Sequence, residues 1–233
     1  DLTRGTGFEA RRDSTVYMVV STLNQASEVT ISQPANLSFE PITVNLSPNS
    51  VQQINLGNFL SLIETKPANT ILNTGLLVRA TQPITAYYEV RSQNNTDLWS
   101  LKGKNSLGLK FYVPFQTEFQ NNQTLGGNPY IPGPRSGFIV MASKNNTTVS
   151  ITPSIDVVDH PGGETFTITL NRGQTYYCEA LDGTPANHPG GSKVESDKEI
   201  TVTIKDDMVD VDASDDGGAD VIGDQLVAYQ YLG

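Results

Sequence analysis

Cysteine, histidine and tryptophan are almost absent from this chain. Its 233 residues contain one cysteine, two histidines and one tryptophan. A single cysteine excludes an intrachain disulfide, so packing, sheet pairing or a bound ion must stabilise the fold. Cys178 follows Thr-Tyr-Tyr in a strand-like stretch, and an unpaired cysteine usually behaves as a small buried apolar residue. We therefore expect Cys178 to be buried in a strand and not to act as a nucleophile.

Positive charge and long apolar runs are also scarce. The 15 basic and 25 acidic side chains give a net charge of −10, whereas a nucleic-acid-binding surface needs clustered Lys and Arg. No apolar stretch approaches the roughly 20 residues that a membrane-spanning helix requires. The sequence therefore predicts no nucleic-acid partner and no membrane insertion. It shows no signal peptide, and we expect it to be a mature or excised part of a longer chain.

The chain is instead rich in short segments in which apolar and hydroxyl residues alternate. Thr148–Thr152 (TVSIT) and Thr165–Leu170 (TFTITL) place apolar side chains on one face and hydroxyls on the other. Runs of strong helix formers are missing. The sequence therefore predicts an all-β protein, with one helical turn over Leu56–Glu64, where Leu60 and Ile63 share a face.

The two halves of the chain resemble each other. Val16–Ser21 and Glu28–Ser32 in the first half are similar to Phe138–Ser143 and Thr148–Thr152 in the second. A repeat of roughly a hundred residues is typical of a β-sandwich. We predict two tandem β-sandwich modules, immunoglobulin-like or jelly-roll-like, over residues 5–119 and 135–233, with residues 120–134 as a linker or long loop. Blades of a β-propeller are the alternative, since a blade also consists of four short strands.

An acidic segment near the end of the chain is a candidate metal site. It carries eight carboxylates between Asp206 and Asp224, and crowding them raises the cost of ionising them all. Part of it matches the first half of a calcium-binding EF-hand loop, but Gly223 stands where that loop has its bidentate Glu. Calcium is therefore the one cofactor that the sequence suggests, and a solvated acidic loop is the alternative. The candidate ligands are Asp210, Asp212, Ser214, Asp216, Asp220 and Asp224.

A second candidate site is the only tryptophan, Trp99, with its neighbours Asn94 and Asp97. An exposed indole could stack on a sugar ring, and the amide and carboxylate could bind its hydroxyls. The alternative is an ordinary core position for Trp99. Two His-Pro-Gly-Gly phrases, at His160 and His188, are expected to be tight turns with exposed histidines, and a two-histidine metal site is their alternative.

No sequence motif of an enzyme is present. A nucleophile elbow, a His-Glu-x-x-His helix and a phosphate-binding loop are all missing. We therefore predict that the protein is not an enzyme. From the residues, its function could be structural and adhesive, carbohydrate binding, or assembly into a stalk or filament through exposed strand edges.

Several phrases in a fixed order resemble a known family. Together they are similar to the IgGFc-binding protein N-terminal domain family, in the form found in large surface and secreted proteins of Bacteroidetes-type bacteria. The resemblance extends from about Gly5 to Leu232. The phrases are Gly5–Phe8, Gln82–Val90, Gly103–Gly108, Phe111–Phe115, Ser196–Ile204 and Ile222–Leu226.

This resemblance implies a non-enzymatic adhesion module within a longer secreted or cell-surface bacterial protein. Such a parent protein would contact other cells, surfaces or glycoproteins, and a type IX system would export it. The partners would be extracellular proteins or glycans, with self-association as a further expectation. The resemblance supplies no catalytic or ligand-binding residues for this chain.

Overall fold

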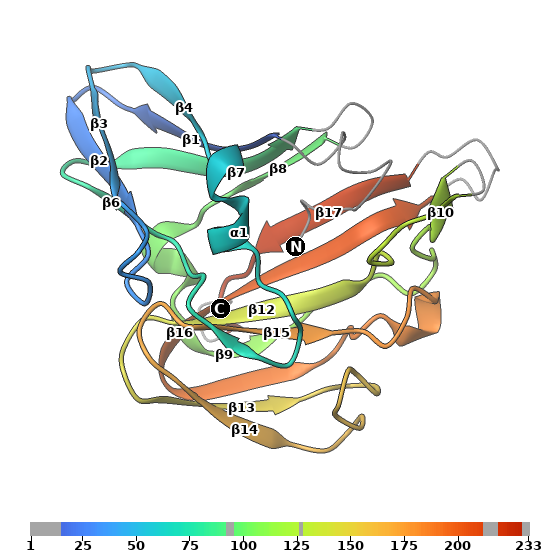
Figure 1. Ribbon diagram of the computed structural model, residues 1–233. Helices are drawn as coiled ribbons and strands as arrows, with labels where there is room; N and C mark the ends of the chain where they lie inside the picture. Colours follow the sequence, from blue (N-terminus) through green and yellow to red (C-terminus); the bar gives the residue numbers. More distant parts are fainter. Residues whose placement is uncertain (1–14, 92–95, 126–127, 212–218, 230–233) are drawn as a thin grey trace.

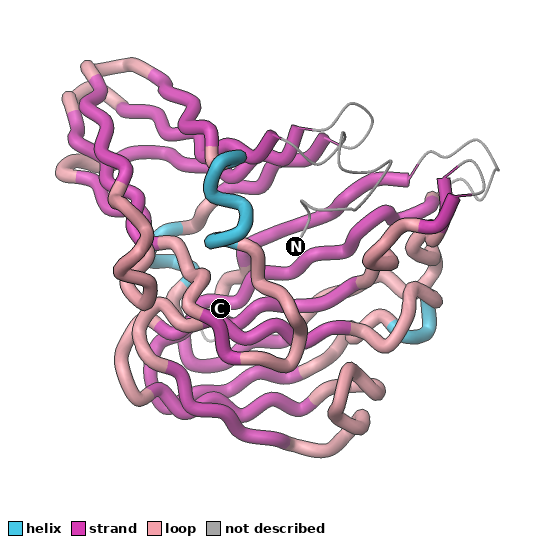
Figure 2. Tube along the Cα trace, viewed as in Figure 1, coloured by secondary structure: helices cyan, strands magenta, loops and turns pink. Residues whose placement is uncertain are grey.

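The fold is built almost entirely of β-strands, as the sequence predicts. The computed structural model describes residues 15–91, 96–125, 128–211 and 219–229. Strands dominate these residues, and helix is confined to short turns (Figure 2). Among the described residues, no helix has the length and apolar character needed to cross a membrane. In Figure 1 the blue strands near the start of the described chain lie above most of the yellow and orange strands of the second half.

The first half consists of two sheets that enclose one apolar core. A four-stranded sheet has the order β4-β1-β7-β8, and a three-stranded sheet has the order β3-β2-β6. Met18 lies opposite Ile54 and Tyr88 in the first sheet. The strands are β1 (Thr15–Thr22), β2 (Ser27–Ser32), β3 (Ile42–Leu46), β4 (Val51–Asn55), β6 (Leu77–Ala80), β7 (Ile84–Arg91) and β8 (Thr96–Ser100).

The alternation of buried and exposed side chains along the strands explains this core. In β2, Val29 and Ile31 are fully buried, while the neighbouring Glu28 is exposed and Thr30 is half-buried. They pack with Val16, Met18 and Val20 of β1. A 3-10 turn over Gly57–Phe59 leads into the helical turn α1 (Leu60–Ile63), and Leu60 closes one side of the core. The predicted helical turn is confirmed.

The second half is an eight-stranded sheet that curls into a nearly closed barrel. Its longest path has the order β14-β13-β16-β12-β15-β5, with β17 and β9 paired to β16. The strands are β5 (Ile71–Leu72), β9 (Gly108–Tyr112), β12 (Ser136–Ala142), β13 (Thr147–Thr152), β14 (Phe166–Leu170), β15 (Thr175–Glu179), β16 (Lys193–Asp210) and β17 (Ala219–Gln225). Between β9 and β12 in the chain, the short strands β10 (Thr124–Leu125) and β11 (Asn128–Pro129) pair with each other.

The 18-residue strand β16 organises this sheet. Near its start, Val194 lies opposite Ile151 of β13 and Phe111 of β9. Further along, Ile204 lies opposite Phe138 of β12 and Asp224 of β17. A strand that belongs to two stretches of one curved sheet is unlike the separate four-stranded blades of a propeller. The propeller alternative is therefore wrong.

The two halves follow one pattern of strand pairing. β12 pairs with β15 and β16 as β1 pairs with β4 and β7, and β13 pairs with β14 and β16 as β2 pairs with β3 and β6. Strands β5 and β9, however, precede residue 119 in the chain and pair into the sheet of the second half. The predicted module boundaries at residues 5–119, 120–134 and 135–233 stay a prediction.

Candidate functional site: an amide-lined groove between the halves

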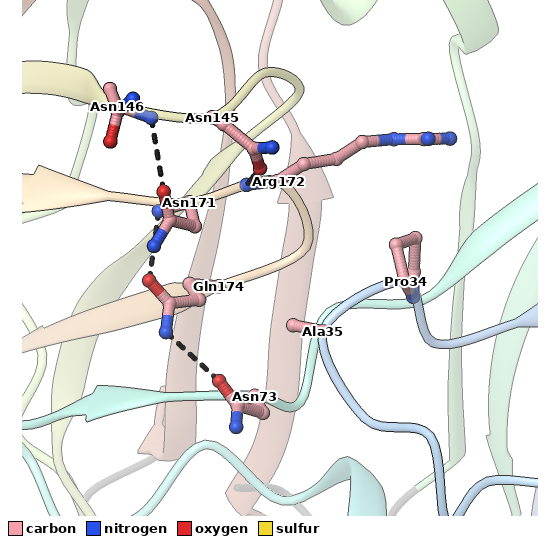
Figure 3. A pocket seen from close by; sticks show the side chains of 8 residues that line it. All are labelled: Pro34, Ala35, Asn73, Asn145, Asn146, Asn171, Arg172 and Gln174. Atoms are coloured by element: carbon pink, nitrogen blue, oxygen red, sulfur yellow. Dashed lines mark hydrogen bonds between the residues drawn. The ribbon is translucent and has the colours of Figure 1, made fainter.

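An open groove of about 500 Å³ lies where loops from both halves meet. The β2–β3 loop supplies Pro34 and Ala35, and Asn73 follows β5. Two turns of the second half supply the remaining residues, all of them polar. Figure 3 shows these residues around the groove, which are Asn145 and Asn146 from the β12–β13 turn and Asn171, Arg172 and Gln174 from the β14–β15 turn.

The two turns form because their residues tolerate the required backbone conformation. Asn146 has a φ of 53°, and Asn is one of the few residues with a side chain that adopts this left-handed region readily. Gly173 has a φ of 80°, which favours glycine. The Lys198 ammonium donates to the carbonyls of Asn145, at 2.9 Å, and Asn146, at 2.6 Å, and so holds the first turn.

A chain of side-chain hydrogen bonds joins the turns to each other and to the first half. The Asn146 backbone N–H donates to Asn171 Oδ1 at 3.1 Å, and the Asn171 N–H donates to Gln174 Oε1 at 2.8 Å. Gln174 Nε2 then donates to Asn73 Oδ1 at 3.0 Å (Figure 3). These hydrogen bonds hold the side chains of Asn73, Asn171 and Gln174 in place along the wall of the groove.

The two halves touch closely beside the groove. A Cβ at Gly173 would lie 3.0 Å from the backbone nitrogen of Ala35, closer than a normal contact. Beside it, the Thr74 and Thr175 hydroxyls lie 2.7 Å apart and share a hydrogen bond. The buried side chain of Gln33 donates to the carbonyl of Thr74 at 3.1 Å. The two halves are therefore closely packed beside the groove.

The free groups of the groove are mainly hydrogen-bond donors. The Oδ1 atoms of Asn73, Asn145 and Asn171 each accept a hydrogen bond within the wall. Their NH₂ groups therefore point away from these hydrogen bonds. Arg172 extends across the opening in Figure 3 and forms no ion pair among the residues that the structure describes. The described lining contains no carboxylate. This set of groups suits a ligand rich in acceptors.

The predicted calcium ligands fall in two classes. Asp212, Ser214 and Asp216 lie outside the described residues. Asp210 at the end of β16 is buried, and Asp220 on β17 is exposed. Asp224 forms an ion pair with Lys102. Within the described part of the chain, no three His, Cys, Asp or Glu side chains come together as a metal site. Calcium binding by this segment stays a prediction.

The predicted sugar-binding residues lie on β8. The Trp99 side chain is only 8% exposed and packs against Tyr88, with the ring centroids 5.2 Å apart. Asp97 accepts hydrogen bonds from the backbone N–H groups of Leu98, at 2.7 Å, and Gly223, at 3.2 Å. Burial raises the pKa of Asp97, and these two hydrogen bonds partly offset the rise. Asn94 lies outside the described residues, and a sugar site here stays a prediction.

The two histidines are less exposed than the sequence suggests. His188 is fully buried, because Gln116, Asn121 and Asp206 supply polar partners around its ring. Its Nε2 lies 3.1 Å from Asn121 Oδ1, and its Nδ1 lies 3.4 Å from Asp206 Oδ2. His160 is half-buried and stacks on Phe166 at a centroid distance of 3.5 Å. The expectation of exposed histidines is wrong for His188.

Cys178 lies on β15, is 3% exposed and is free, as predicted. Burial raises the pKa of its thiol to about 12. Such a thiol is protonated at neutral pH and is a poor nucleophile.

The groove is not predictable from local sequence patterns. Its two turns are recognisable as Asn-Asn and Asn-Arg-Gly between alternating segments, which is a strong turn signal. The approach of Asn73 and of the β2–β3 loop depends on how the halves pack. No local pattern in the sequence encodes that packing.

Comparison with known proteins gives one match. The family model described as IgGFc binding protein matches residues 99–233, which is more than half of the chain and includes both Asn-rich turns of the groove. No curated protein and no solved structure matches the chain.

Proposed function

The chain belongs to the IgGFc binding protein family, a binding and non-catalytic family, and from this premise we propose that the groove is its contact site for glycoproteins. The observation that carries the proposal is the Arg172 guanidinium, which extends across an opening lined by amide side chains and, among the described residues, by no carboxylate. A guanidinium beside amide NH₂ groups selects ligands by their acceptor oxygens.

The ligand that fits best is an acidic sugar. A guanidinium binds a carboxylate or sulfate through two parallel hydrogen bonds, and amide NH₂ groups bind sugar hydroxyls and carbonyls. The chain as a whole carries a charge of −10, so an anion is attracted only where basic groups gather. Arg172, which forms no ion pair among the described residues, provides such a group at the groove. The open shape suits the end of a glycan that remains attached to its protein.

The setting that we propose is a secreted or cell-surface protein of bacterial type, in which this chain is one module of a longer adhesin. The sequence resemblance described above supports this setting. Export by a type IX system belongs to the same proposal. Contact with glycoproteins would then join the parent protein to other cells or to host surfaces.

A glycan array tests the proposed ligand class. The array would carry neutral, carboxylated and sulfated glycans, and the binding of the hits would be measured by calorimetry. We expect acidic glycans to bind, and Arg172→Gln to weaken them about tenfold or more, because a hydrogen bond to a charged group is lost. Arg79→Gln, which removes an exposed arginine of β6 outside the groove, is the matched control.

Two outcomes would overturn the proposal. One is an array without signal from any acidic glycan. The other is equal weakening by Arg172→Gln and Arg79→Gln, which would show a general effect of charge. A signal restricted to glycans that Trp99→Ala abolishes, with Arg172→Gln unaffected, would move the site to β8.

A further inference from the structure

A buried polar cluster surrounds His188 where the segment after β9 meets the second half. The His188 side chain is fully buried, and Asp206 of β16 beside it is 4% exposed. Gln116 and Asn121 complete the cluster and belong to residues 115–123, which lead from β9 towards β10. Buried polar groups are stable only when their hydrogen bonds are satisfied, so the donors and acceptors of this cluster show where its protons lie.

The Asn121 amide determines the state of one ring nitrogen of His188. Asn121 Nδ2 donates to Asp206 Oδ1 at 2.8 Å and to the Asp207 carbonyl at 2.6 Å, which uses both hydrogens of its NH₂ group. Its Oδ1, an acceptor, therefore faces His188 Nε2 at 3.1 Å. Nε2 must carry a hydrogen to donate to this oxygen.

Gln116 determines the state of the other ring nitrogen. Its Oε1 accepts from the N–H groups of Glu118, at 2.8 Å, and Phe119, at 2.7 Å. Its NH₂ group has the Phe119 carbonyl at 2.9 Å and Asp206 Oδ2 at 3.2 Å as acceptors for its two hydrogens. His188 Nδ1 lies 2.9 Å from the Gln116 backbone carbonyl and 3.4 Å from Asp206 Oδ2, both acceptors. A hydrogen on Nδ1 satisfies this arrangement.

The charge of Asp206 distinguishes this arrangement from a neutral ring. The Gln116 NH₂ group also lies 2.9 Å from His188 Nδ1, and it would donate to that nitrogen if the nitrogen were bare. The Gln116 carbonyl would then face a lone pair, and the Asp206 carboxylate would be buried without a cation. Among the described residues, His188 is the one ion-pair partner of Asp206. Because an uncompensated buried charge is strongly unfavourable, the imidazolium is favoured.

The other charged side chains of the surrounding elements point elsewhere. Lys205 precedes Asp206 on β16, so its side chain points to the opposite face of the strand, where its ammonium lies 5.2 Å from the centre of the Tyr177 ring. Glu118 and Asp182, on the two loops that meet the His188 ring, are exposed. Asp206 is therefore the charge that faces the imidazole.

We propose that His188 is doubly protonated in the folded protein at neutral pH, and that its ion pair with Asp206 is a pH-sensitive switch that holds residues 115–123 against the second half. Next to the ion pair, the Asn121 N–H donates to the Gly183 carbonyl at 2.8 Å and the Asn122 N–H to the Met208 carbonyl at 2.7 Å. Loss of the Nδ1 hydrogen at higher pH would leave Asp206 unpaired and weaken this attachment. The switch is independent of the groove.

The direction of the pH dependence follows from proton counting. An unfolded histidine loses its second proton near pH 6.5, roughly the ordinary value for this side chain. Above that pH the folded state binds one proton more than the unfolded state, so stability is greatest below pH 6.5 and falls as the pH rises.

Nitrogen-15 NMR of the histidine rings tests the protonation state. The chain contains two histidines, so His160→Gln leaves His188 as the single imidazole and assigns its signals. We expect a hydrogen on both nitrogens at pH 7.5, and Asp206→Asn to remove the one on Nδ1 because the counter-charge is lost. The wild-type spectrum contains both rings, so it gives an answer even if a variant is unstable. A bare His188 nitrogen at pH 7.5 in wild type, or double protonation that Asp206→Asn leaves unchanged, would overturn the proposal.

Urea denaturation between pH 6.5 and 8.5 tests the switch. We expect the equilibrium constant for folding to fall by up to about tenfold per pH unit in wild type, because one proton is released on unfolding. His160→Gln is the matched control and should keep this slope, whereas His188→Gln should lose it. Cys178 does not interfere, since its thiol has an ordinary pKa of 9.0, above this range. A wild-type stability that does not fall over this range, or an equal slope in a folded His188→Gln variant, would contradict the switch.

Discussion

The indole ring of Trp99 on β8 lies directly against Gly223 on β17. A Cβ at Gly223 would come within 3.0 Å of the ring, so glycine is the residue that allows this approach. Next to this contact, the Lys102 backbone N–H donates to Gln225 Oε1 at 2.7 Å. Trp99 therefore joins the first half to the second.

Replacing Trp99 by alanine should lower stability. We expect Trp99→Ala to reduce the free energy of unfolding by about 3–5 kcal/mol, because it leaves a large cavity between β8 and β17. Urea denaturation followed by circular dichroism would measure it. Gly223→Val should also destabilise the protein, through overlap with the ring. A Trp99→Ala variant as stable as wild type would contradict the packing described here.

The contact of Gly173 with the β2–β3 loop should be measurable against a second glycine. Gly173 and Gly163 both have positive φ, at 80° and 77°, but a Cβ at Gly163 would meet nothing within 4 Å. Both alanine variants carry the backbone cost, and only Gly173→Ala also crowds Ala35. We expect Gly173→Ala to lower the free energy of unfolding by about 1–3 kcal/mol more than Gly163→Ala. Equal losses in the two denaturation curves would argue against a close contact between Gly173 and the β2–β3 loop.

The Cys178 thiol should resist labelling in the folded protein. Burial raises its pKa to about 12 from an ordinary value of 9.0. At pH 8 we expect no reaction with iodoacetamide until denaturant is added, as mass spectrometry would show. Because the folded pKa is the higher one, the thiol's contribution to stability is fully present below pH 9 and is lost as the pH rises towards 12. Rapid labelling under native conditions would refute this burial.

Calcium should stabilise the protein if the acidic segment binds it. A ligand that binds only the folded state raises the melting temperature as its concentration increases. Calorimetry with millimolar calcium against EDTA would measure the shift, with magnesium as the control because it prefers a more rigid octahedral site. Asp216→Asn should reduce the shift. An identical melting temperature in calcium and EDTA would eliminate the cation.

Much of the strand content could be predicted from local pattern. The alternation in residues 148–152 corresponds to the buried and exposed positions of β13, because side-chain direction in a strand has a period of two. The helical turn at Leu60 and the burial of Cys178 follow from equally local signals. These features depend on neighbours within a few residues.

The remaining features depend on contacts between distant residues. His188 is buried because Asn121 and Asp206 meet it from segments 67 and 18 residues away in the chain. Strand pairing of β5 with β15 and of β9 with β16 is set by how the halves pack. The groove arises from the same packing, and single-segment patterns carry no information about it.

Strand β9 precedes residue 119 but pairs with β16 in the sheet of the second half. Cutting the chain at residue 119 would therefore separate two paired strands of one sheet. A fragment starting at residue 120 would lack β9. The first part of β16 would then have unpaired backbone donors and acceptors, and Val194 would lose its partner Phe111. We expect such a fragment to aggregate in solution, and to become more soluble when a peptide with the sequence of β9 is added. The solubility of this fragment would therefore be lower than that of the intact protein.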